Sequence, residues 1–141
     1  MPEDYRIELT DRPADADHTI VGFGLRDFNE RIAGPTAHRP LCLFLHAPDG
    51  ATVGGLVGAT YYDWFFIELL WVKEELRGQG HGHRLLAQGE DEARHRGAHG
   101  AFLDTFSFQA PGFYRECGYQ VFGELPDFPH GHSRIYFWKR L

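Results

Sequence analysis

The stretch 75–86, ELRGQGHGHRLL, constrains the fold of this chain more than any other. Three glycines alternate with polar residues directly after an apolar run and directly before two leucines. Glycine costs backbone entropy on folding, so this pattern indicates a place where bare backbone is required. An apolar strand followed by a glycine-rich turn and a helix start is typical of a phosphate site. The first N–H groups of a helix have no partner within the helix, and the positive end of the helix dipole lies at the same place.

Apolar periodicity before this stretch predicts several strands and one helix. The expected strands are 4–10, 40–47, 52–62 and 63–72, with a tight turn at 48–50. We expect a helix within 14–35 that is broken by Gly22 and Gly24 and stopped by Gly34 and Pro35.

The region after the glycine stretch predicts a strand–helix–strand unit. Residues 83–97 form an expected amphipathic helix that buries Leu85, Leu86 and Ala93 and stops at Gly97. The further expected elements are strand 100–108, helix 109–117 and strands 119–125 and 133–141. No repeat or linker interrupts the chain, so we expect a single mixed α/β domain over 1–141.

Composition excludes several classes of protein. The chain has 141 residues, of which 43% are hydrophobic and 24% charged, as in a globular domain. A net charge of −6 without a basic block argues against a nucleic-acid partner. No apolar run is long enough to span a bilayer, and the acidic start is unlike a signal peptide. We therefore expect a cytoplasmic protein without a membrane partner, whose two cysteines do not form a disulfide framework.

Three kinds of phosphate site compete for the glycine stretch. A P-loop requires Gly-Lys-Ser/Thr at the helix start, and GHGHR does not contain it. A dinucleotide fold requires G-x-G-x-x-G early in the chain, whereas GQGHGH has another spacing and follows expected antiparallel strands. A nicotinamide-dependent oxidoreductase therefore stays only as an alternative. The third kind of site binds coenzyme A.

Two segments resemble the GNAT N-acetyltransferase family. The first is Arg77-x-x-Gly80-x-Gly82, directly after Leu70-Trp71-Val72, which resembles the acetyl-CoA pyrophosphate loop of that family. The second lies within 107–125 and resembles the family's short helix with a tyrosine acid. Its matching residues are Ala110, Tyr114, Gly118 and Tyr119.

The resemblance implies a GNAT-type fold and a set of residues that bind acetyl-CoA as co-substrate. The fold has a mostly antiparallel central sheet flanked by helices, with a splayed strand pair around the CoA arm. The main chain of Leu70, Trp71 and Val72 is then expected to bind the pantetheine. The residues expected at the pyrophosphate are Arg77, Gly78, Gln79, Gly80, His81, Gly82 and His83. Many relatives have an asparagine where this chain has Ser107, and either Ser107 or Gln109 is expected to replace its contact.

The same resemblance implies direct acetyl transfer to a primary amine without a metal. Tyr114 matches the acid that protonates the departing thiolate, and a phenol is protonated at neutral pH. The base is open between Glu68, a carboxylate within an apolar strand, and Asp104 on the following strand. Glu68 is either buried, which would raise the pKa of its carboxyl, or on the solvent side of a half-exposed strand.

The acceptor side is the least constrained part of the site. Asn29, Asp104 and His130 are expected to contact the acceptor, which is an amine of a small molecule or of a protein. The aromatic-rich C-terminal region is compatible with a homodimer surface or with a core. The alternative function is a non-catalytic module that binds acyl-CoA as a sensor or regulator.

Overall fold

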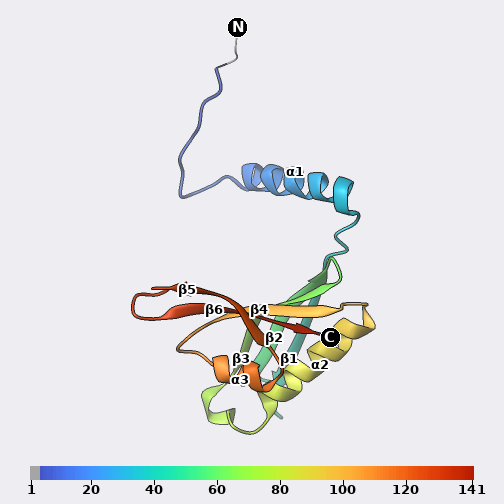
Figure 1. Cartoon of the computed structure of the whole chain (residues 1–141), viewed down its shortest axis with the longest axis vertical. Coiled ribbons are helices and arrows are strands. Elements are labelled where there is room, and N and C mark those ends of the chain that lie inside the picture. Colours follow the sequence, from blue (N-terminus) through green and yellow to red (C-terminus); the bar gives the residue numbers. More distant parts are fainter. Residues whose placement is uncertain (1–3) are drawn as a thin grey trace. The chain divides into compact units, whose positions relative to one another are not determined.

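The computed structural model describes residues 4–141, which fall into two units at residue 36 (Figure 1). The first unit contains one helix, and the second contains a six-stranded sheet with helices. Each unit is described by itself below. The single domain expected over the whole chain stays a prediction.

The first unit is built around helix α1, Asp15–Ala33. This helix is continuous, so the expected break at Gly22 and Gly24 is wrong: a glycine weakens a helix by about 1 kcal/mol but does not interrupt its hydrogen bonds. The helix ends at Gly34, as expected, with φ of 86°. The strand expected at 4–10 is wrong for the structure described, since residues 4–10 are irregular and do not belong to the sheet.

The sheet of the second unit has the order β1-β2-β3-β4-β6-β5. All neighbouring strands run antiparallel except the parallel pair β3 and β4. The strands are β1 Arg39–His46, β2 Thr52–Tyr61, β3 Trp64–Val72, β4 Gly100–Phe106, β5 Gln120–Pro126 and β6 Ser133–Arg140. The expected bounds of these strands agree within two residues, and the mostly antiparallel sheet predicted from the resemblance is confirmed.

Two helices pack against one face of this sheet (Figure 1). Helix α2, His81–His95, begins two residues earlier than expected and buries the predicted apolar stripe, including Leu85, Leu86 and Ala93. Helix α3, Pro111–Glu116, adds Tyr114 to the same core, and a short 3₁₀ turn, η1 Glu74–Leu76, precedes the glycine stretch. The largest fully buried side chains of this core are Phe65, Phe137, Leu56, Leu86 and Leu103.

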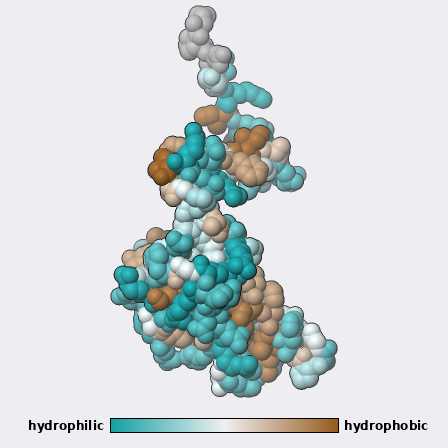
Figure 2. Space-filling model, turned by 90° about the vertical axis from the view of Figure 1, so that its right-hand side faces the viewer, coloured by the Kyte–Doolittle hydropathy of each residue, from teal (hydrophilic) through white to brown (hydrophobic). Residues whose placement is uncertain are grey.

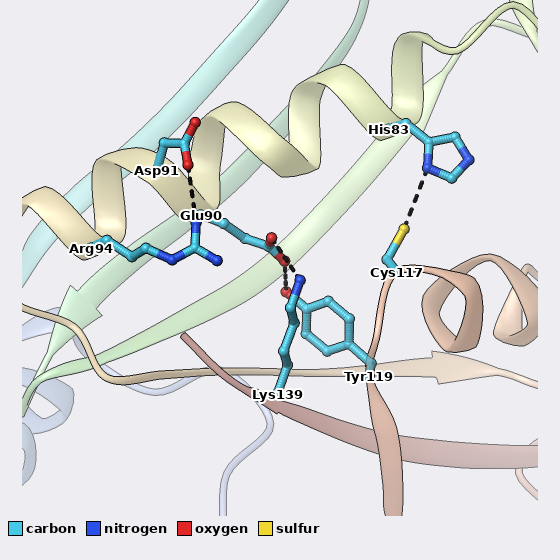
Figure 3. Close-up of polar contacts among 7 residues, drawn as sticks. All are labelled: His83, Glu90, Asp91, Arg94, Cys117, Tyr119 and Lys139. Atoms are coloured by element: carbon cyan, nitrogen blue, oxygen red, sulfur yellow. Dashed lines mark hydrogen bonds and ion pairs between the residues drawn. The ribbon is translucent and has the colours of Figure 1, made fainter.

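A buried charged cluster joins α2 to β6 and to the segment after α3 (Figure 3). Glu90 of α2 is 5% exposed, and its carboxylate accepts hydrogen bonds from the Tyr119 hydroxyl at 2.7 Å and the Lys139 ammonium at 2.9 Å. Lys139 is in β6, and Tyr119 lies between α3 and β5. Because a buried carboxylate requires such partners, the cluster fixes α2 relative to β6 and to the segment after α3.

None of the helices within residues 4–141 is both long and apolar enough to cross a membrane. In the same part of the chain, no three metal-binding side chains gather into one group.

Candidate active site

The parallel strands β3 and β4 separate after a short paired region. Only Trp64–Phe66 pair with Gly100–Phe102, and the rest of both strands diverges. The edge of β3 that faces β4 therefore has no strand partner over 67–72, as expected for a splayed pair. A cleft of about 930 Å³ lies there, lined by β3, the glycine turn, the start of α2, β4 and α3. Backbone N–H and C=O groups of β3 are thus available to a ligand in the cleft.

A β-bulge in β3 lies beside this separation. Val57 pairs with Leu69 and Gly58 pairs with Ile67, so Glu68 is the extra residue between them. Bulges are frequent next to active sites because they redirect a side chain. Glu68 lines the cleft and is exposed to solvent, so the burial that we considered for this carboxylate is wrong. Its exposure agrees with the other alternative, a place on the solvent side of the strand.

The glycine turn forms the opposite end of the cleft. Gly78 and Gly80 have φ of 75° and 85°, a region that L side chains avoid, and both border open space. Gly80 is the N-cap of α2 and provides no side chain to bond the first helical N–H groups. These groups remain available to an anion, and the helix dipole favours negative charge there.

Cationic and imidazole side chains surround the same helix start. The Arg77 Nε donates to the Val72 carbonyl at 2.9 Å, which holds the guanidinium against the end of β3 while its other N–H groups stay available. The His83 ring packs on Phe113 and its Nδ1 lies 3.4 Å from the Cys117 sulfur (Figure 3). The Nδ1 of His81 is buried without a hydrogen-bond partner. A buried polar atom of this kind calls for a further group in the cleft.

Tyr114 reaches the cleft from α3 and is 8% exposed. Burial, with smaller contributions from Cys117 and Asp104, raises the pKa of its phenol to about 12. Its ring contacts Phe113, Tyr119 and Phe137, whereas no other described residue hydrogen-bonds to its hydroxyl. The phenol therefore stays protonated at neutral pH and has an unused donor.

Two polar residues of the β4 region also line the cleft. Asp104 accepts a hydrogen bond from Arg134 Nε at 2.7 Å, so this carboxylate is already paired. The Gln109 side-chain oxygen accepts from the Phe106 N–H at 2.8 Å and the Thr105 hydroxyl at 3.0 Å. Gln109 thus holds the turn after β4, and its amide N–H₂ group remains as a donor.

Some residues predicted for the site lie elsewhere. Gln79 is exposed, and its amide donates to the Glu75 carbonyl at 3.4 Å. Ser107 accepts from the Ser133 N–H at 3.0 Å and joins β4 to β6. His130 is exposed to solvent beside Asp127. None of the three lines the cleft, because each sits in a turn or strand junction whose local direction the sequence does not specify. Asn29 belongs to α1 in the other unit.

The other predicted residues line the cleft, together with residues that the sequence did not indicate. The predicted residues that line the cleft are Glu68, Leu70, Trp71, Val72, Arg77, Gly78, Gly80, His81, Gly82, His83, Asp104, Gln109 and Tyr114. Those that sequence reasoning missed are Ile67, Leu69, Leu76, Leu103, Thr105, Phe108 and Phe113. Period-two alternation along β4 from Asp104 leads to Phe106 and not to Phe108, because Phe108 lies in the turn after the strand.

A splayed strand pair, an uncapped helix start behind a glycine turn and a buried phenol are the features that the resemblance implies for an acyltransferase that uses coenzyme A. Sequence comparison agrees with this class, since the acetyltransferase (GNAT) family model matches residues 5–119. The chain belongs to the GNAT acetyltransferase family. It is an acetyl-CoA-dependent N-acetyltransferase.

Individual relatives carry related names. Blasticidin-S acetyltransferase of Streptomyces morookaense is 45% identical over 93 residues, which are 65% of this chain and 68% of that protein. Acetyltransferase Atu2258 of Agrobacterium fabrum is 36% identical over 122 residues, covering 86% of this chain and 85% of the relative. A crystal structure of an acetyltransferase from Agrobacterium tumefaciens, 33% identical, matches with a TM-score of 0.92 and covers 97% of this chain and 100% of its own.

Proposed function

We propose that this enzyme acetylates the primary amine of a small cationic molecule similar to blasticidin S. The distribution of charge along the cleft carries this proposal. The helix start and Arg77 attract an anion at one end, and the exposed carboxylate of Glu68 attracts a cation at the other. The name of the Streptomyces relative supports the same class of acceptor. An amino group of a protein is the competing acceptor.

Coenzyme A fits the end of the cleft that is formed by the start of α2 and Arg77. The N–H groups of the first turn of α2 and the free guanidinium donors of Arg77 suit a pyrophosphate, and the buried His81 Nδ1 offers a further polar contact. The unpaired edge of β3 at Leu70, Trp71 and Val72 suits the amide groups of the pantetheine arm. Acetyl-CoA supplies the activated acetyl group as a thioester.

Two side chains then move the protons in a direct transfer. Glu68 accepts a proton from the acceptor ammonium, directly or through water, and leaves a neutral amine. The amine nitrogen bonds to the acetyl carbon while the carbon–sulfur bond breaks. The Tyr114 hydroxyl gives its proton to the departing thiolate, and the second proton that the nitrogen loses as the amide forms returns to the phenolate, directly or through water. We assign the base to Glu68 because Asp104 is paired with Arg134.

We also propose a cytoplasmic location and a homodimer for this enzyme. Free thiols at Cys42 and Cys117 agree with a reducing compartment.

Calorimetric titration tests the cofactor half of the proposal. Acetyl-CoA should bind, whereas NADH and ATP should bind at least tenfold more weakly. Gly80→Ala should weaken acetyl-CoA at least tenfold, because alanine disfavours φ of 85° and shifts the N–H groups of the helix start. Gly50→Ala is the matched control: Gly50 has φ of 89° and open space around it, but lies outside the cleft. Equal loss of affinity in both variants would contradict the proposed pyrophosphate site.

Thiol release with a panel of amines tests the acceptor half. Blasticidin S should be acetylated with a kcat/KM at least tenfold above that of a short peptide with a free α-amino group. Glu68→Gln should lower kcat by about 10²–10⁴-fold, the usual contribution of a positioned base. Glu124→Gln, an exposed carboxylate on β5, should leave kcat unchanged. A preference for the peptide would assign the enzyme to protein acceptors.

A further inference from the structure

His83 differs from an ordinary histidine on the surface of a helix. Hydrophilic residues cover much of the second unit in the view of Figure 2, and a histidine on such a surface keeps its ring in water. His95, at the other end of α2, is an exposed residue of this kind. His83 is exposed as well, yet its ring contacts the end of helix α3. Those contacts hold the ring in one place.

An aromatic contact and a thiol contact both act on the His83 ring. The ring packs on that of Phe113, with 4.7 Å between the ring centroids, and the His83 Nδ1 lies 3.4 Å from the Cys117 sulfur (Figure 3). Phe113 belongs to α3, and Cys117 is the C-cap of that helix. A histidine ring can turn over about its χ2 bond unless something distinguishes its two orientations. The thiol makes that distinction, because it bonds a nitrogen and not a carbon of the ring.

The state of the Cys117 thiol determines which nitrogen of His83 carries the proton. Burial, with a smaller contribution from Glu90, raises the pKa of the Cys117 thiol, so the sulfur keeps its hydrogen at neutral pH. The thiol is then the donor, and the Nδ1 of a neutral imidazole is the acceptor. The hydrogen of the neutral ring is therefore on Nε2.

The position of His83 gives this Nε2–H group a use. His83 is the third residue of α2 and lines the cleft at the helix start, where the free N–H groups suit a pyrophosphate. In Figure 3 its second nitrogen points away from Cys117. An imidazole N–H adds one more donor to this set, and a hydrogen bond to a charged oxygen is stronger than one between neutral groups.

We propose that Cys117 is a positioning residue for coenzyme A, which holds His83 so that its Nε2–H donates to the pyrophosphate. Cys117 does not itself line the cleft, so it acts through the histidine ring. The thiol neither ionises nor reacts in this role. The inference rests on the proposed coenzyme A site, and it does not depend on the identity of the acceptor amine.

Calorimetric titration with acetyl-CoA at pH 8 measures the effect on affinity. Without the thiol, two tautomers and two ring orientations compete, and one combination in about four presents the donor. Cys117→Ala should therefore bind acetyl-CoA about fourfold more weakly. Cys117→Ser should stay within about twofold of the wild type, because its hydroxyl also donates. Cys42→Ala is the matched control, since Cys42 is the other free cysteine and lies outside the cleft. Equal losses in the alanine and serine variants at position 117 would overturn the proposal.

Acetyl-pantetheine, which lacks the pyrophosphate, separates a lost phosphate contact from a general disturbance of the cleft. With acetyl-CoA, Cys117→Ala should raise KM about fourfold and change kcat by less than about twofold. With acetyl-pantetheine, the same variant should have the KM of the wild type. A similar rise of KM for both thioesters would contradict the role at the pyrophosphate.

A double variant tests whether Cys117 acts through His83. His83→Phe keeps a ring on Phe113 but has no nitrogen, and it should weaken acetyl-CoA at least about tenfold, as expected for a lost hydrogen bond to a charged group. Adding Cys117→Ala to His83→Phe should cause no further loss. Losses of affinity that add up in the double variant would show that the two residues act independently, against the proposal.

Nitrogen NMR of the free protein reads the tautomer directly. At pH 8, where an imidazole is largely neutral, His83 should have a protonated Nε2 and an unprotonated Nδ1. Its signals are identified by their loss in His83→Phe. Cys117→Ala should shift both nitrogens toward a mixture of tautomers, whereas Cys42→Ala should not. A protonated Nδ1 in the wild type would overturn the role of Cys117 even if acetyl-CoA binds. Absence of acetyl-CoA binding by the wild type would instead refute the proposed cofactor site itself.

Discussion

Tyr114 and Tyr119 allow the same substitution to test two different roles. Their rings are 6.0 Å apart, and both side chains are buried. The Tyr114 hydroxyl lies at the cleft and no other described residue bonds it, whereas the Tyr119 hydroxyl donates to the Glu90 carboxylate at 2.7 Å. Replacement by phenylalanine removes one oxygen in each case. We expect Tyr114→Phe to affect catalysis and Tyr119→Phe to affect stability.

The expected losses of stability and of kcat are opposite for the two variants. Loss of a hydrogen bond to a charged group should lower the free energy of unfolding of Tyr119→Phe by about 1.5–3 kcal/mol. Tyr114→Phe loses no such bond, so its free energy of unfolding should stay within about 0.5 kcal/mol of the wild type. Without its acid, Tyr114→Phe should lose about 10²–10⁴-fold in kcat, whereas Tyr119→Phe should stay within about threefold of the wild type, because its hydroxyl lies outside the cleft.

Urea unfolding and thiol release measure these two quantities. Because burial raises the pKa of Tyr114 to about 12, the phenol is still protonated at pH 9. Its ionisation should therefore cause no loss of rate between pH 7 and about pH 11, and a loss should begin only as the pH approaches that pKa. A Tyr114→Phe variant with nearly wild-type kcat would refute the acid role. Equal loss of kcat in both variants would show that the rings act through packing.

Three further predictions follow from local contacts. Gly82→Ala should raise the free energy of unfolding by up to about 1 kcal/mol in urea, because position 82 is helical and the added methyl group makes ordinary contacts. A thiol reagent at pH 8 should modify exposed Cys42 before Cys117, whose pKa is raised by burial, as peptide mapping would show. Lys139→Met should lower the free energy of unfolding by about 3–5 kcal/mol because Glu90 loses its cation, and the double variant with Glu90→Leu should recover part of it.

The sequence predicted the elements that carry strong local patterns. Apolar runs and turn residues located the six strands of the sheet, and the glycine stretch located the start of α2. The glycine-turn end of the candidate site was predictable for the same reason: Gly78, Gly80 and His81 lie within four residues of sequence in one strand–turn–helix junction. Their positions in space follow from that local geometry alone.

The other parts of the site depend on tertiary structure. Ser107 lies in the segment expected to contact the pantetheine, but the pairing of β4 with β6 turns its hydroxyl to the Ser133 N–H. Glu68 reaches the cleft through a bulge, and a bulge results from strand register that no local pattern specifies. Whether Asn29 contributes to a site depends on where α1 packs. That is a question of contacts between units rather than of helix propensity.

The strand expected at 4–10 and the strand β3 show what a local pattern leaves open. The alternation of residues 4–10 is that of a strand, yet a strand exists only as part of a sheet. The sequence of β3 is apolar at nearly every position instead of every second one, which indicates a strand with cover on both faces. Helices α2 and α3 pack against one of these faces. Alternation thus predicts that a face is buried, but the element that buries it is distant in the sequence and no local pattern identifies it.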